Sequence, residues 1–130
     1  IAPGEKKEYD LLHEAGIDVW LHSCGDIRRI LPDLTEMGID VLNPVQPECM
    51  DLAELKEKYG HKLTYFGGIS TQRILPNGTP DEVRRETRRV VELMSKNGGY
   101  ITAPSQEIMP DVPYENLIAL IDTAKEYMGD

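Results

Sequence analysis

The chain has 130 residues, enough for one domain, and 40% of them are hydrophobic, which suffices for a buried core. Its formal net charge of −9 argues against a nucleic-acid-binding surface, and no apolar run reaches the length of a membrane span. Two cysteines are too few for a disulfide framework, so we expect a protein of the reducing cytoplasm.

Short apolar strands and amphipathic helices alternate along the sequence. Apolar runs predict strands over residues 17–21, 39–42, 62–66 and 100–103. Helical spacing of apolar residues predicts helices over 5–15, 27–37, 52–59, 79–97 and 113–128. Glycine directly follows each of the first four helices and is typical of a helix end, since it adopts the left-handed conformation at little cost.

Local signals mark where two of the helices begin. Thr79, Pro80 and Glu82 form an N-terminal capping box with proline in the first turn. Pro32 should kink or delay the helix that ends before Gly38, because proline lacks a backbone N–H and clashes with the preceding turn.

Two further expectations concern burial. Trp20 lies inside a strand, so we expect its ring to pack in the core. In the last helix, a single apolar stripe is expected to face the core; it consists of Leu117, Ile121, Ala124 and Met128.

The order of the elements predicts an α/β fold. Strands that alternate with helices pair in parallel through right-handed crossovers, as in a doubly wound sheet or a (β/α) barrel. Reactive polar side chains follow each strand directly, and chemistry gathered at the C-terminal ends of successive strands favours the barrel. A full TIM (β/α)8 barrel takes about 250 residues, so we predict half of one.

Half a barrel leaves its outer strands with unpaired edges, which proteins avoid. We therefore expect either a missing half or self-association of two copies to cover them. The sequence begins with Ile1 rather than methionine, and we expect the chain to be a fragment of a longer protein.

The first strand runs directly into His22, Ser23, Cys24 and Gly25. An imidazole and a thiol two residues apart lie on the same side of an extended backbone, and both are ligands that Zn²⁺ prefers. A packed strand end with a structural thiol is the alternative interpretation, because a His-x-Cys pair is a weak motif by itself. The pattern indicates a candidate metal site and leaves that alternative open.

Several segments of the sequence resemble the C-terminal half of the uroporphyrinogen decarboxylase superfamily along nearly the whole chain. The order and spacing of these segments, taken together, are specific to the superfamily. The segments cover residues 22–26 (His-Ser-Cys-Gly-Asp), 38–46, 59–60, 66–69, 78–83, 98–101 and 112–116. The superfamily includes the decarboxylase and the zinc-dependent methyltransferases that serve corrinoid proteins or thiols such as coenzyme M. The resemblance implies that residues 1–130 are the last four βα units of a TIM barrel whose N-terminal half is absent from this chain.

The resemblance to the methyltransferase branch also implies a ligand set. His22 and Cys24 would hold zinc, together with a cysteine seven residues before the proline that opens the last helix. That position is Gln106 in this sequence, and the decarboxylase branch has a histidine there. A substitute third ligand would have to come from Cys49, Glu48 or Glu107.

Other polar groups are expected to assist at the same edge. Asp26 and Asn43 are candidate partners for an imidazole N–H, although Asp26 is equally placed to cap the following turn. Gln106 and Glu107 lie at the mouth of the barrel, where polar groups tend to be functional.

A glycine pair follows the third predicted strand. Gly67, Gly68 and Ser70 could present backbone N–H groups to an anionic substrate or cofactor. A tight turn would explain the two glycines equally well.

Together these features favour methyl transfer between a small molecule or thiol and a corrinoid protein, with zinc as the Lewis acid. Decarboxylation of a porphyrinogen is the alternative, but it needs cationic groups to hold many carboxylates, and few follow the strands here. A non-catalytic subunit that binds a corrinoid partner is the third hypothesis. We expect the full-length protein to be an enzyme and the isolated chain to be inactive.

Overall fold

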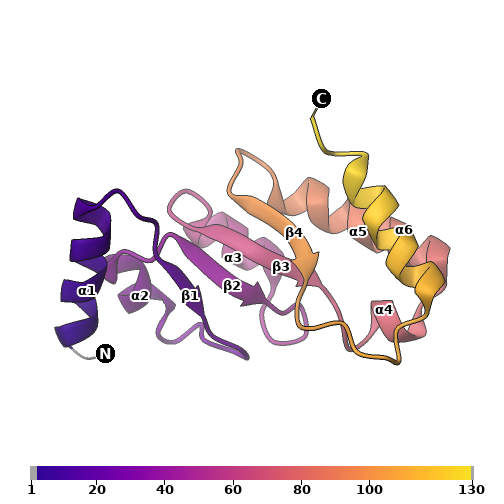
Figure 1. Ribbon diagram of the computed structural model, residues 1–130, viewed down its shortest axis with the longest axis horizontal. Coiled ribbons are helices and arrows are strands. Elements are labelled where there is room, and N and C mark those ends of the chain that lie inside the picture. The colour runs from indigo at the N-terminus through magenta and orange to yellow at the C-terminus, as the bar shows by residue number, and fades with distance from the viewer. Residues whose placement is uncertain (1–2, 130) are drawn as a thin grey trace.

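The computed structural model describes residues 3–129, in which helices and strands alternate. The elements are α1 (Pro3–Glu14), β1 (Trp20–His22), α2 (Leu31–Met37), β2 (Val41–Val45), α3 (Leu52–Tyr59), β3 (Thr64–Ile69), α4 (Ile74–Asn77), α5 (Pro80–Met94), β4 (Tyr100–Pro104) and α6 (Tyr114–Lys125). The four strands form one parallel sheet in the order β1-β2-β3-β4, so successive βα units lie side by side (Figure 1). The predicted alternation and parallel pairing are confirmed.

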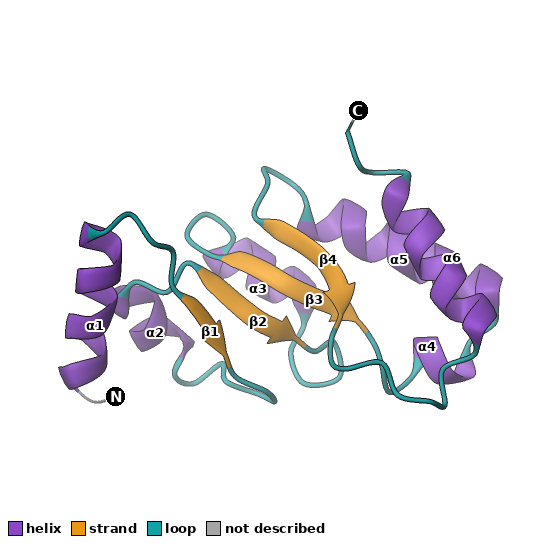
Figure 2. Ribbon diagram, viewed as in Figure 1, coloured by secondary structure: helices purple, strands orange, loops and turns teal. Residues whose placement is uncertain are grey.

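Helices α3 and α5 lie behind the sheet in Figure 2, whereas the near face of the strands is open in that view. The core lies between sheet and helices; its fully buried members include Leu42, Val45, Leu55, Tyr65, Ile69, Val83, Val90 and Met94. Within residues 3–129, no helix combines the length and the apolar character that crossing a bilayer requires.

The expectation that Trp20 packs in the core is wrong, because its side chain is 54% exposed. Successive side chains of a strand point to opposite faces, and Trp20 shares its face with His22 on the open side of the sheet. Its ring centroid lies 5.9 Å from that of Phe66, so the two rings cover part of this face together.

The strand boundaries also differ from the predicted ones. β2 and β3 run several residues further, while β1 begins only at Trp20. A side chain accounts for the late start, because Asp40 Oδ2 accepts a hydrogen bond from the Val19 N–H at 2.7 Å. The same oxygen lies 2.7 Å from His13 Nε2, which ties α1 to the start of the sheet.

Local capping signals are confirmed. Thr79 and Glu82 form the predicted capping box at the start of α5, with Glu82 Oε2 accepting from the Thr79 N–H at 2.7 Å. Pro32 lies in the first turn of α2, which starts at Leu31, as expected for a delayed helix. The short helix α4 was not predicted, and α5 ends earlier than expected, at Met94.

The predicted buried stripe of α6 is wrong. The buried residues are Asn116, Ala119, Leu120 and Thr123, whereas Ile121 and Met128 are 39% and 72% exposed. The helix is therefore turned about its axis relative to the predicted orientation. Asn116 holds it there, because its Nδ2 donates to the carbonyls of Leu75 at 2.8 Å and Gly78 at 2.7 Å. A polar residue on the buried side is invisible to an analysis based on apolar periodicity.

Replacing Asn116 by alanine should lower the free energy of unfolding by roughly 1–3 kcal/mol, because two carbonyls at the end of α4 lose their shared donor. Urea unfolding of the full-length protein measures the change. Glu115→Ala, at an exposed position of the same helix, is the control and should change stability little. Equal stability of the two variants would contradict the role assigned to Asn116.

Candidate functional site

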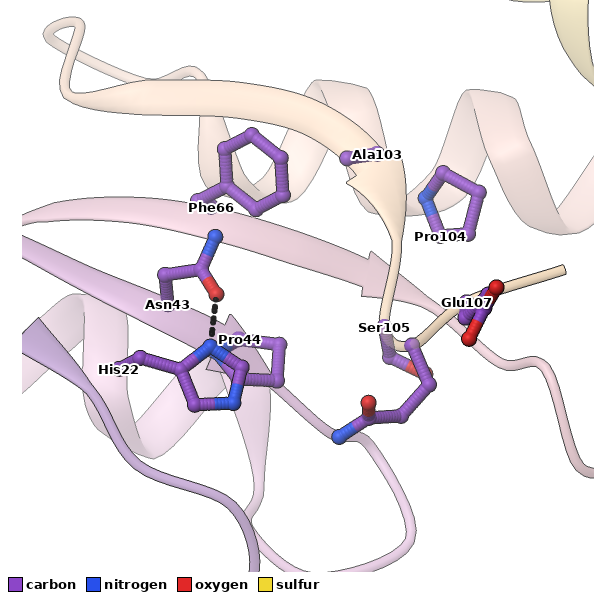
Figure 3. Close-up of a pocket in the computed structure, with 9 residues that line it drawn as sticks. His22, Asn43, Pro44, Phe66, Ala103, Pro104, Ser105 and Glu107 are labelled. Atoms are coloured by element: carbon purple, nitrogen blue, oxygen red, sulfur yellow. Dashed lines mark hydrogen bonds between the residues drawn. The ribbon is translucent and has the colours of Figure 1, made fainter.

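A pocket of about 280 Å³ opens near the carboxyl ends of the strands (Figure 3). Its lining comes from all four strands and the loop after β4; it consists of His22, Asn43, Pro44, Phe66, Ala103, Pro104, Ser105, Gln106 and Glu107. Because the carboxyl ends of parallel strands meet at one edge of the sheet, side chains far apart in the sequence share this pocket.

His22 is oriented by the neighbouring strand. β1 and β2 pair so that His22 lies opposite Asn43, and the His22 Nδ1 is 2.9 Å from the Asn43 Oδ1, as the dashed line in Figure 3 shows. An amide oxygen is only an acceptor, so in the neutral ring Nδ1 carries the hydrogen and Nε2 keeps its lone pair. Nε2 in turn lies 3.3 Å from the Cys24 Sγ, so a nitrogen lone pair faces a sulfur atom.

Gln106 completes the surroundings of this sulfur. Its Nε2 donates to the Cys24 Sγ at 2.9 Å, across 82 residues of sequence. The structure therefore brings together His22, Asn43, Cys24 and Gln106, four of the residues selected from the sequence.

Gln46 holds the loop that carries Cys24, a role that the sequence analysis missed. Gln46 is only 5% exposed, and its Oε1 accepts a hydrogen bond from the Gly25 N–H at 2.7 Å. A glutamine just after the second predicted strand was the available signal, but its partner across the sheet could not be read from the sequence.

Replacing Gln46 by alanine should speed amide hydrogen exchange at Gly25 roughly tenfold, because one hydrogen bond worth up to about 1.5 kcal/mol is removed. Hydrogen–deuterium exchange of the full-length protein, read on peptides that contain residues 22–26, measures this effect. Gln72→Ala, at an exposed glutamine, is the matched control. Unchanged exchange in the Gln46 variant would show that this contact does not hold the loop.

Asp26 is engaged locally. Its carboxylate accepts hydrogen bonds from the Arg28 backbone N–H at 3.1 Å and from the guanidinium Nε and Nη2 at 2.8 and 2.7 Å. These hydrogen bonds from Arg28 lower the pKa of Asp26 to about 2. Of the two candidate partners of the His22 ring, the structure places Asn43 there, and Asp26 serves the following turn.

Comparison with known proteins identifies the family to which this chain belongs. The sequence model described as uroporphyrinogen decarboxylase (URO-D) matches residues 1–127, nearly the entire chain. The chain belongs to the uroporphyrinogen decarboxylase family.

Relatives of this URO-D chain include methyltransferases. It is 33% identical over 107 residues to the methylcobamide:CoM methyltransferase MtaA of Methanosarcina barkeri, covering 82% of this chain and 30% of that protein. It is 27% identical over 106 residues to the methylated-thiol–coenzyme M methyltransferase of Methanosarcina mazei, covering 82% of this chain and 27% of that protein.

A solved structure agrees with the fold. A methyltransferase from Methanosarcina mazei matches with a TM-score of 0.72 and 26% identity, over 95% of this chain and 35% of that one. The URO-D chain therefore spans between 27% and 35% of the length of these proteins. The predicted family and the α/β fold of the TIM-barrel type are confirmed.

Whether the URO-D site can hold the zinc implied by the resemblance depends on its donor set. A catalytic zinc site uses three protein ligands, drawn from cysteine, histidine and carboxylate side chains. His22 and Cys24 supply two, and the adjoining side chain is the amide of Gln106. Among residues 3–129, no three His, Cys, Asp or Glu side chains come together as a metal site. The described residues do not fit a complete zinc site.

The substitute ligands considered for the third position have other surroundings. Glu48 accepts a hydrogen bond from the Ser70 hydroxyl, and that hydroxyl accepts one from the Arg73 N–H at 2.9 Å. Cys49 packs against the hydrophobic core, and Glu107 lines the pocket without joining a metal cluster within the described range. Ser70 thus organises the turn that leads into α4.

The two glycines of the URO-D chain lie within β3, so the strand predicted to end before them was too short. A Cβ on Gly67 would lie 3.1 Å from the backbone of Val45, and one on Gly68 would lie 3.1 Å from Tyr100 Oη. Close packing against Val45 and Tyr100 accounts for both glycines, and their predicted role in binding an anion stays a prediction.

Proposed function

We propose that the full-length protein transfers a methyl group between a corrinoid protein and a small molecule, most simply a thiol. The observation that carries this proposal is the His22–Cys24 pair at the carboxyl edge of a URO-D sheet, beside a pocket of small-molecule size. Relatives that act on methylcobamide and coenzyme M support it. In this proposal residues 1–130 form the last four βα units of the barrel, and the rest of the protein supplies the others.

His22 is the proposed proton acceptor. Its Nε2 lone pair accepts the proton of the substrate thiol as the thiol sulfur bonds to the methyl carbon. The bond between that carbon and the cobalt of the corrinoid substrate breaks, and its electron pair stays with the corrinoid. Asn43 keeps the Nε2 lone pair on the reacting side. The Cys24 sulfur lies beside Nε2, and the Gln106 amide contacts that sulfur. Because the described residues do not complete a zinc site, we assign no step to zinc.

The lining of the pocket favours methyl transfer over decarboxylation of a porphyrinogen. A substrate with many carboxylates needs cationic side chains around it. Within the described residues, the pocket is lined by no lysine or arginine, and it carries the carboxylate of Glu107. This pocket lining suits a small, weakly charged substrate better than a polycarboxylate.

The test is to incubate the purified full-length protein with methylcobalamin and coenzyme M. We expect methylated thiol by mass spectrometry and loss of the methylcobalamin absorbance. A parallel incubation with uroporphyrinogen checks for coproporphyrinogen. Coproporphyrinogen without methylated thiol would replace the proposal by decarboxylation. Binding of a corrinoid protein with no turnover in either assay would favour the non-catalytic subunit.

A further inference from the structure

We infer that Gln106 takes the place of a metal ligand, so that this protein binds zinc only weakly and an amide holds the Cys24 sulfur instead. This inference concerns metal affinity and does not depend on the methyl transfer proposed above. It starts from the contact between Gln106 Nε2 and Cys24 Sγ, at 2.9 Å.

Ser105, the residue before Gln106, holds the backbone of this loop in place. Ser105 is fully buried, and its N–H donates to the Ile69 carbonyl at 2.7 Å. Its hydroxyl accepts a hydrogen bond from the Thr71 N–H at 3.4 Å. Because Ser105 is anchored to the end of β3 in this way, the next side chain is held at the edge where Cys24 lies.

The spacing of the other two donors suits a metal ion. With zinc bonds of about 2.0–2.1 Å to nitrogen and 2.3 Å to sulfur, a tetrahedral angle separates the two ligand atoms by roughly 3.5 Å. The observed separation of His22 Nε2 and Cys24 Sγ is 3.3 Å, close to that value. The pair itself is therefore compatible with one shared ion.

Gln106 is the group that does not suit zinc. The lone pair of an amide nitrogen is delocalised into the carbonyl, so Nε2 donates hydrogen bonds and does not coordinate metals. The carbonyl oxygen is a poor substitute, because zinc prefers thiolate, imidazole or carboxylate. Two strong ligands remain, fewer than the three protein ligands of catalytic zinc sites.

No neighbouring side chain in the described range replaces the third ligand. Two candidate third ligands predicted from the sequence make other contacts. Glu48 accepts a hydrogen bond from the Ser70 hydroxyl, and Cys49 packs against the hydrophobic core. Within residues 3–129, the identity of residue 106 thus separates a site with two strong ligands from one with three.

The experiment compares zinc binding by the wild-type full-length protein and by Gln106→Cys. After dialysis against a competing chelator, the wild type should retain well under one zinc per chain, and Gln106→Cys about one. The zinc affinity should rise by more than about 100-fold, since even changes to residues outside the ligand set alter it by about 10- to 100-fold. Cobalt substitution should give the thiolate-to-cobalt absorption only in the variant.

Glu107→Cys is the matched control, because it adds a thiol one residue further along and should leave zinc retention at the wild-type level. Gln106→His tests the same position with imidazole and serves if the cysteine variant fails to fold, which circular dichroism reports. Stoichiometric, chelator-resistant zinc in the wild type would overturn the inference. So would folded Gln106 variants that retain no more zinc than Glu107→Cys.

Discussion

The His22→Ala variant of the full-length protein should transfer methyl groups at least about 100-fold more slowly than the wild type. Removal of a positioned general base typically costs about 10²- to 10⁴-fold in rate, and His22 is the proposed proton acceptor. The measurement is the rate at which methylated thiol forms from methylcobalamin under saturating thiol.

Asn43→Ala separates the chemical role of His22 from its orientation. This variant keeps the imidazole but removes the oxygen that lies 2.9 Å from Nδ1, so we expect a smaller loss of rate than in His22→Ala. His61→Ala is the control, since His61 lines a separate pocket with Lys56, Lys96 and other residues. A His22→Ala variant with more than half the wild-type rate would remove His22 from the mechanism.

Gly67→Ala should destabilise the full-length protein by roughly 2–5 kcal/mol, the largest stability effect that we predict. Gly67 has a φ of +118°, which costs an L-residue about 1–2 kcal/mol, and its added Cβ would meet the Val45 backbone at 3.1 Å. Overpacking against a backbone that cannot move freely adds a further cost of about 1–3 kcal/mol. Urea unfolding measures the total.

Gly98→Ala is the matched control for this substitution. Gly98 has a φ of +77°, but a Cβ there would meet no atom within 4 Å. The control should therefore lose only the conformational part, about 1–2 kcal/mol. If the two variants were equally stable, the close approach of β2 and β3 at Gly67 would have no energetic weight.

Much of the architecture could be predicted from the sequence because its causes are local. The capping box of Thr79 and Glu82 and the delay of α2 at Pro32 each depend on residues within one helical turn. Alternating apolar strands and helices determine parallel pairing, and parallel pairing gathers the residues after the strands at one edge. His22, Asn43 and Gln106 were selected in this way.

Only the tertiary structure decided which of these residues touch and which faces are buried. Trp20 and the buried face of α6 were assigned wrongly, because the face of an element that becomes buried depends on what packs against it. The contact of Gln46 with Gly25 and that of Gln106 with Cys24 depend on the register of separate strands, which no local pattern encodes. The sequence thus determined which functional groups reach the edge of the sheet. The packing of the four βα units determined that the Cys24 sulfur meets one imidazole and one amide there.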